Sequence, residues 1–228
     1  WHKKTRESRD LKRAEEILFK ELKHARPDYS FLMEENGAIE GADSQHRFII
    51  DPLDGTTNFL HGVPLFAISL ALERQGQMVA AVIYNPAMDE LYTAERGGGA
   101  FLNDRRMRVA GRTVLSDCII GTGIPHLGYG HHGNYLLQLR NVMGETAGVR
   151  GLGASSLDLA YVAAGRLDGH WQEGIELWDI AAGILLIREA GGFITDKNGK
   201  MDALDGSSVV AGNEIIHKAL TRTLAKPL

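Results

Sequence analysis

The sequence has a single cysteine, Cys118, among 228 residues. An intramolecular disulfide is therefore impossible, and a reducing, cytoplasmic location is the simplest interpretation. There is no apolar run of about 18 residues and no signal-peptide-like segment, so we expect neither a membrane span nor secretion. Neither sign of charge dominates, because the formal net charge is −4 and the isoelectric point is near 6.1. We therefore expect no direct binding to nucleic acid or to an anionic membrane surface.

Hydrophobic residues are plentiful at 44% of the chain, enough for a substantial core, and we expect one domain over residues 1–228. Periodicity predicts a mixed α/β order of elements. Strands are expected at 46–50, 117–125 and 193–200, with a hairpin at 65–86 that turns at Gln75 and Gly76. Helices are expected at 11–22, 135–148, 155–169, 178–192 and 212–225, the last with Asn213 as its N-cap.

The segment DPLDGTT places two acids, Asp51 and Asp54, at the end of the apolar strand HRFII. Pro52 ends ladder pairing, and Gly55 permits backbone conformations that other residues avoid. Two carboxylates held this close repel each other unless a cation lies between them. Such an oxygen-rich pocket suits Mg²⁺, and the N–H groups after Gly55 offer donors to a phosphate. The alternative is an Asx-type turn that caps a helix.

Two more segments place acids at the ends of predicted elements. Glu34 and Glu35 end the apolar run FLM, and Asp179 begins the apolar helix of WDIAAG. An acid in a first helical turn is also favoured by the helix dipole, so Asp179 has capping as an alternative role. Three acidic segments at element ends are nevertheless typical of a metal site assembled from loops.

These motifs, EE, DPLDGTTNF and WDIAAG followed by EAGG, resemble the signatures of the inositol monophosphatase family, within the magnesium-dependent, lithium-sensitive phosphatases. The resemblance runs from about Phe31 to the C-terminus, and SSLDLAYVAAGRLDGHW resembles bacterial members in particular. It implies a layered αβαβα fold, a homodimer and Mg²⁺-dependent hydrolysis of a small phosphorylated polyol. Because the chain starts at Trp1 and the helices that normally open the fold are missing, we expect its N-terminal helical part to be incomplete.

The resemblance also implies roles for individual residues. The first metal would be held by Glu35, Asp51 and the carbonyl of Leu53, and the second by Asp51, Asp54 and Asp179. Thr56 would orient the attacking water, and Gly55 with Thr56 would contact the phosphate. The substrate would meet Gly153, Ser155 and Glu173, where Glu173 accepts hydrogen bonds from hydroxyl groups. Family members often carry alanine at the Ser155 position.

The upstream element of the family differs here. Relatives carry an aspartate that binds a third, weakly held metal, and Asp10 is the candidate, with a residue of a first helical turn as the alternative.

Other functions share the same motifs. The substrate alternatives are fructose bisphosphate, a 3′-phosphonucleotide, histidinol phosphate and NADP. A different class of function is also open, since some bacterial homologues act as accessory protein-binding factors in transcription or ribosomal RNA synthesis, which would add a transcription-factor partner.

Overall fold

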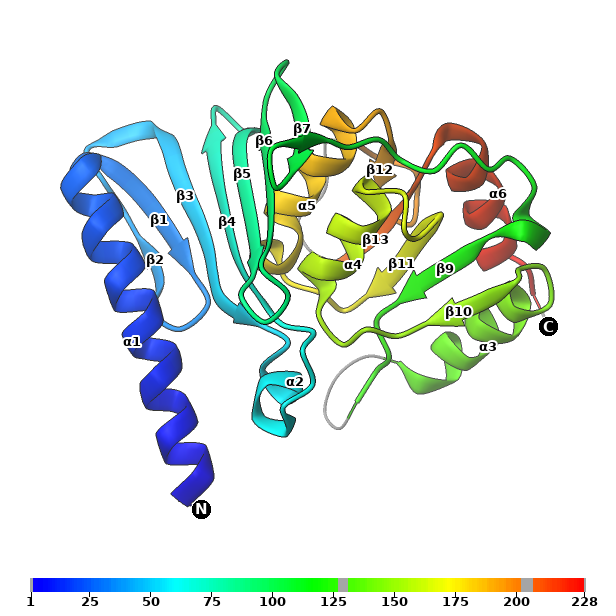
Figure 1. Cartoon of the computed structure of the whole chain (residues 1–228), viewed down its shortest axis with the longest axis horizontal. Helices are drawn as coiled ribbons and strands as arrows, with labels where there is room; N and C mark the ends of the chain where they lie inside the picture. Colours follow the sequence, from blue (N-terminus) through cyan, green and yellow to red (C-terminus); the bar gives the residue numbers. More distant parts are fainter. Residues whose placement is uncertain (1, 127–130, 202–206, 228) are drawn as a thin grey trace.

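The structure, a computed structural model, describes residues 2–126, 131–201 and 207–227, with the backbone alone for 2–10. Its elements form five layers, which Figure 1 shows from left to right: α1 (His2–Ala25), a first sheet, the helix pair α4 (Ser155–Ala163) and α5 (Leu177–Glu189), a second sheet, and the pair α3 (His132–Met143) and α6 (Glu214–Leu224). The expected αβαβα arrangement is confirmed. Asp10, the candidate for a third metal, lies outside the described side chains.

Within the described residues the first sheet has eight strands in the order β2-β1-β3-β4-β5-β6-β7-β8. The strand β3 pairs in parallel with β1 and antiparallel with β4, whereas the strands from β4 to β8 form a meander of hairpins. Their bounds are β1 Tyr29–Met33, β2 Gly37–Ile39, β3 Asp43–Asp54, β4 Ala67–Arg74, β5 Gln77–Asn85, β6 Glu90–Glu95, β7 Gly99–Leu102 and β8 Arg105–Arg106.

The second sheet has five strands among the described residues, in the order β10-β9-β11-β13-β12. Its central strand β11 runs parallel to β9 and antiparallel to β13. The bounds are β9 Ile119–Thr122, β10 Gly148–Arg150, β11 Gly169–Glu173, β12 Phe193–Thr195 and β13 Ser208–Gly212. Two short helical segments complete the description, α2 at Thr56–His61 and a 3₁₀ turn, η1, at Leu115–Asp117.

Side-chain alternation in β3 decides which way Asp51 points. Phe48 and Ile50 belong to a cluster of buried side chains under α1, whereas Ile49 belongs to the main core around α4 and α5. Successive residues of a strand face opposite sides, so Asp51 continues the face of Ile49 and points into the helical layer between the sheets. The carboxylates of the DPLDG segment are thereby carried to the interior of the molecule.

The sequence-based elements are mostly confirmed. The hairpin turns at Gln75 and Gly76, both with positive φ, and Asn213 caps α6 by accepting the backbone N–H of Ile216 at 2.9 Å. The helix expected at 155–169 is shorter in the structure, because α4 ends at Ala163 and β11 begins at Gly169. This strand, which the sequence did not predict, lies in the middle of the second sheet and ends at Glu173. The five residues of this strand follow directly on the helical pattern of α4, which conceals them.

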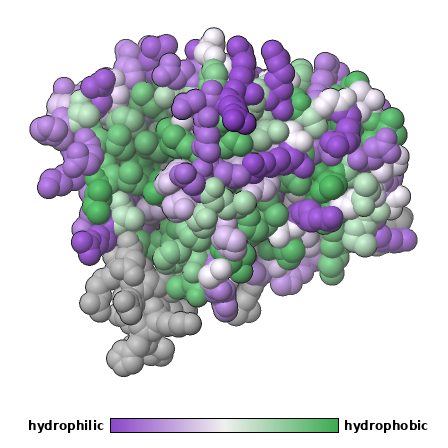
Figure 2. Space-filling view, in the orientation of Figure 1, coloured by the Kyte–Doolittle hydropathy of each residue, from purple (hydrophilic) through white to green (hydrophobic). Residues whose placement is uncertain are grey.

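The face of the molecule seen in Figure 2 carries hydrophilic side chains around its upper rim and hydrophobic ones toward its centre-left. Among the described residues, no helix combines the length and the apolar composition that crossing a membrane requires.

Candidate active site

Asp51 and Asp54 lie at the end of β3, where the strand changes register. Asp51 pairs with Ser69 and Asp54 with Ala67, and the ladder is irregular between them. Both carboxyl groups are buried. One oxygen of Asp51 accepts the backbone N–H of Leu53 at 2.9 Å, which is the Asx-type turn that the sequence offered as an alternative. The turn and the acidic pocket therefore coexist, because the turn uses one carboxylate oxygen and leaves the other available.

The helix α4 holds the Asp54 carboxylate. Its Oδ2 accepts the backbone N–H of Ser156 at 2.6 Å and the Ser156 hydroxyl at 2.5 Å. Backbone N–H groups in the first turn of a helix have no partner within the helix, so a carboxylate at this point satisfies them. Ser156 was not predicted from the sequence, since its role depends on an acid 102 residues away.

The helix α5 supplies the third acid, Asp179. Its side chain accepts the backbone N–H of Glu176 at 3.0 Å, and the two residues form a capping box at the start of α5. Asp179 is therefore a capping residue, as the sequence allowed, and also a member of the acidic group. Asp51, Asp54 and Asp179 each offer an oxygen atom within 4.8 Å of the other two.

Burial, with repulsion between some of these acids, favours their protonated forms. Burial is the main cause that raises the pKa of Asp51 well above its usual value, and Asp54, Glu34 and Asp179 raise it further. Burial also raises the pKa of Asp54, and burial with the charge of Asp54 raises that of Asp179 to about 7. Within the described residues no lysine, arginine or histidine forms an ion pair with these three acids.

This donor set fits a divalent cation that prefers oxygen ligands. Three carboxylates converge without a positive side chain among the described residues to balance them, and only a bound cation or bound protons relieve their repulsion. No sulfur or imidazole belongs to the group, which favours a hard, oxygen-preferring divalent cation over zinc or copper.

Gly55 and Thr56 follow the acids at the start of α2. Gly55 has φ +84°, and a Cβ there would lie 2.8 Å from the carbonyl oxygen of Leu65, so the turn requires glycine. The Thr56 hydroxyl donates to the carbonyl oxygen of Leu53 at 3.0 Å. The structure thus brings the predicted Leu53 carbonyl and the predicted Thr56 hydroxyl together.

Asn58 joins α2 to the segment before α4. Its amide donates to the carbonyl oxygens of Leu65 at 2.7 Å and Leu152 at 2.8 Å. Gly153, with φ +77°, packs on the Asn58 amide, which a Cβ would approach to 3.0 Å. The asparagine of DGTTN therefore holds Gly153 beside the turn that carries Asp54, a role that sequence reasoning missed.

The two acids after β1 make different contacts. Glu34 interacts with the Asp51 carboxyl, and burial with the neighbouring acids raises its own pKa. Glu35 instead donates its backbone N–H to the buried Glu15 of α1 at 2.9 Å. The carboxyl that the structure brings to Asp51 is that of Glu34, while Glu35 as a metal ligand remains a prediction.

The predicted substrate contacts divide between the two faces of β11. Ser155 donates its hydroxyl to Oε1 of Gln172 at 3.0 Å, on the face of the sheet that carries α4. Glu173, the next residue, faces α3 and α6. It accepts hydrogen bonds from Asn134 at 3.2 Å, Gln138 at 2.6 Å and Lys197 at 3.1 Å.

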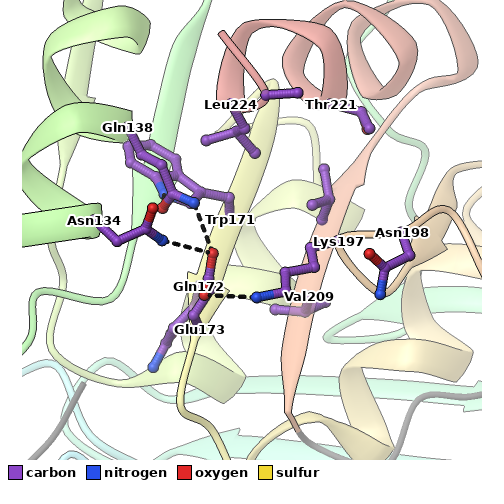
Figure 3. A pocket seen from close by; sticks show the side chains of 12 residues that line it. Asn134, Gln138, Trp171, Gln172, Glu173, Lys197, Asn198, Val209, Thr221 and Leu224 are labelled. Atoms are coloured by element: carbon purple, nitrogen blue, oxygen red, sulfur yellow. Dashed lines mark hydrogen bonds and ion pairs between the residues drawn. The ribbon is translucent and has the colours of Figure 1, made fainter. Parts of the chain in front are cut away.

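Figure 3 shows this second environment, a cavity of about 250 Å³ with Glu173 on one wall and side chains of α6 opposite. The donors around Glu173 lower the pKa of its carboxyl against the effect of burial, so it is ionised near neutral pH. The structure does not bring Glu173 to Ser155, and its contact with substrate remains a prediction. The residue beside Ser155 is Gln172, which sequence reasoning missed because the strand was not recognised.

Fold and site together define a layered α/β protein whose buried acidic group, supplied by β3 and α5 and held by α4, is suited to a divalent metal ion. The comparisons with known proteins agree with this class. Residues 8–227 match the model of the inositol monophosphatase family, and the chain belongs to this family of phosphatases.

The relatives carry two kinds of name. An inositol-1-monophosphatase of Mesorhizobium japonicum is 70% identical over 217 residues, 95% of this chain and 82% of that protein. The Nus factor SuhB of Pseudomonas aeruginosa is 46% identical over 215 residues, 92% of this chain and 79% of that protein. The crystal structure of the extragenic suppressor protein suhB of Bartonella henselae is 60% identical with a TM-score of 0.92, and the match covers 96% of this chain and 84% of that one.

The raised pKa of Asp179 predicts a pH-dependent loss of stability without metal. Its pKa is 3.8 when unperturbed and about 7 when folded, so between these pH values the folded state retains a proton that the unfolded state has lost. In a chelator, stability should therefore fall from pH 4 to 7 by up to about 1.4 kcal/mol per pH unit relative to Asp179→Asn, which lacks this titration. Thermal melts of both proteins in EDTA measure the difference, and parallel curves would contradict it.

Proposed function

We propose that this protein hydrolyses a phosphate monoester in a Mg²⁺-dependent reaction, and that the substrate is myo-inositol monophosphate. The observation that carries the proposal is the uncompensated group of the buried Asp51 and Asp54 and the partly buried Asp179. The inositol-1-monophosphatase name of the 70% identical relative supports the choice of substrate.

The metal ions would be held by the three aspartates, with the carbonyl of Leu53 and the carboxylate of Glu35 as the further ligands that the motif implies. Two Mg²⁺ ions are proposed, with a third one in the family pattern if Asp10 contributes. When bound, such ions activate a water molecule and stabilise the leaving oxygen of the ester. The bond from Ser156 holds one oxygen of Asp54 in place, so the other is directed into the group.

The residues after the acids are proposed to position the water, the phosphate and the polyol. Thr56 is proposed to orient the attacking water, and its bond to Leu53 fixes its hydroxyl beside a ligand carbonyl. Gly55 and Thr56 are proposed to donate backbone N–H groups to the phosphate. Gly153 and Ser155, held by Asn58 and Gln172, are proposed to meet the polyol.

Other small phosphate esters remain alternatives, and a panel of esters assayed with Mg²⁺ distinguishes them. Equal turnover of all members would refute the inositol assignment. Cytoplasmic location, lithium inhibition and a homodimer are proposed on the family pattern, and inhibition assays and light scattering test the latter two.

A second candidate is an accessory role in transcription through a protein partner. The observation that favours it is the 46% identity to a Nus factor. An Asp54→Asn variant separates the roles: a binding function that does not need catalysis would survive this substitution in cells, whereas a phosphatase function would not.

The acidic group predicts that Mg²⁺ stabilises the protein. At a concentration 100 times its dissociation constant, Mg²⁺ should raise the melting temperature by roughly 5–10 °C. Asp54→Asn should lose most of this increase and reduce kcat by about 100-fold or more, equivalent to about 3 kcal/mol in the barrier. Thermal melts with a Mg²⁺ titration and a phosphate-release assay measure both effects. A wild-type melting temperature that does not respond to millimolar Mg²⁺ would overturn the metal site.

The opposite faces of β11 predict different effects of two neighbouring substitutions. Gln172→Ala removes the side chain beside Ser155 and should raise KM for inositol phosphate by about 10-fold, or about 1.4 kcal/mol in kcat/KM. Glu173→Gln should change kcat/KM less, because Glu173 faces α3 and α6. Steady-state kinetics on inositol phosphate and on an aryl phosphate without hydroxyl groups provide the test. A larger and substrate-selective loss in Glu173→Gln would instead restore Glu173 as the polyol contact.

A further inference from the structure

Three elements beside the proposed substrate site, β9 with the residue after it, β11 and α4, each contribute two residues to a pair of stacked layers. The inner layer consists of Gly121, His170 and Asp158. The outer layer consists of Gly123, Gln172 and Ser155. The strand positions are two residues apart and the helix positions three apart, so each pair lies on one face of its element. The parallel register pairs His170 with Gly121 directly.

The inner layer contains two buried polar groups. His170 is 0% exposed and Asp158 is 1% exposed, and His170 Nδ1 lies 3.9 Å from Asp158 Oδ1. Among the described residues, neither ring nitrogen and neither carboxylate oxygen has a partner at hydrogen-bond geometry. A Cβ on Gly121 would lie 3.0 Å from both Asp158 Oδ1 and His170 Nδ1, so this position must stay without a side chain.

A packing role alone does not explain this pair. Burying polar groups without full partners costs about 1–3 kcal/mol each, and apolar side chains of similar size would avoid that cost. A metal site is not an explanation either, because within the described residues the one group of three or more metal-binding side chains is that of Asp51, Asp54 and Asp179. A role in which the polar groups of His170 and Asp158 take part would explain their burial.

The outer layer lies directly above the pair and leads to the acidic group. The Gln172 amide packs flat on Gly123, where a Cβ would lie 2.1 Å from Gln172 Cδ, and its Oε1 accepts the Ser155 hydroxyl at 3.0 Å. The next residue of α4 is Ser156, which binds Asp54. In the inner layer, burial lowers the pKa of His170 to about 3, while its interaction with Gln172 opposes that shift. The imidazole is therefore neutral and offers one donor and one acceptor.

We propose that His170 and Asp158 are positioning residues that act through Gln172 and Ser155 to set which end of the Gln172 amide faces the polyol of the substrate. An amide presents an acceptor on one side and donors on the other, so its orientation decides whether it favours a hydroxyl donor or an oxygen acceptor. A neutral imidazole next to it, with the Asp158 carboxyl 3.9 Å from its Nδ1, favours one orientation. This inference rests on the proposed phosphatase function and adds how the polyol is selected.

The test is a double-substitution cycle with two substrates. His170→Phe keeps the ring shape and removes both nitrogens, Gln172→Ala removes the amide, and the third protein carries both. His170→Phe should raise KM for inositol phosphate by roughly 3- to 10-fold, the size typical of coupled neighbours, with little change in kcat and none on an aryl phosphate. In the Gln172→Ala background it should have almost no further effect.

The matched control is His217→Phe, which replaces another buried histidine, bonded to Thr195 at 2.9 Å between α6 and β12. It should lower stability without changing KM. If His170→Phe does not fold, His170→Asn and Asp158→Asn replace it in the same cycle.

The outcomes separate the two proposals. Equal losses on both substrates, or effects of His170 and Gln172 substitutions that multiply independently, would overturn the positioning role and leave the phosphatase assignment intact. A wild-type protein that hydrolyses no ester with Mg²⁺ would overturn the phosphatase function itself.

Discussion

The mutual repulsion of three converging carboxylates, two of them buried and one partly buried, is the constraint on which the rest of the site depends. Asp51, Asp54 and Asp179 each place a carboxylate oxygen within 4.8 Å of the other two. Burial raises the pKa of all three, Asp54 and Asp179 raise that of Asp51 further, and Asp54 raises that of Asp179. Such a group persists only because the backbone around it is held from several sides. The Asx-type turn fixes Asp51, the start of α4 fixes Asp54, and the capping box of α5 fixes Asp179. Each contact that orients an acid also belongs to the termination of a strand or the start of a helix.

The layered fold brings these three points together. Alternation in β3 turns Asp51 toward the helices between the sheets, and both of those helices begin beside the end of that strand. Helix N-termini carry free N–H groups and a partial positive charge, which favours carboxylates and phosphates at the same place. The middle layer therefore supplies both the partners of the acids and a favourable environment for an anionic substrate.

The second sheet adds a polar extension of the site. Its strand β11 presents His170 and Gln172 to α4, and Trp171 and Glu173 to α3 and α6. The two faces of β11 therefore line two different environments. An error of one residue in predicting which side chain faces α4 would move that side chain to the face of α3 and α6. Gln172 and Glu173 illustrate this sensitivity, because the first lies beside Ser155 and the second beside Gln138.

Much of this protein was determined by its sequence alone. The sequence predicted the five long helices, the hairpin at Gln75 and Gly76, the acidic pair of DPLDG and the family itself. These features depend on periodicity, capping residues and glycine turns, which act over a few residues. Tertiary structure alone decided the long-range partners within the site: Ser156 for the Asp54 carboxylate, Leu152 for the Asn58 amide, and Glu34 beside Asp51. It also decided the face of each residue in β11, a strand too short to show a period of its own. The physical reason is that these contacts join residues up to about a hundred positions apart, so they depend on register and layer packing, which no local pattern encodes.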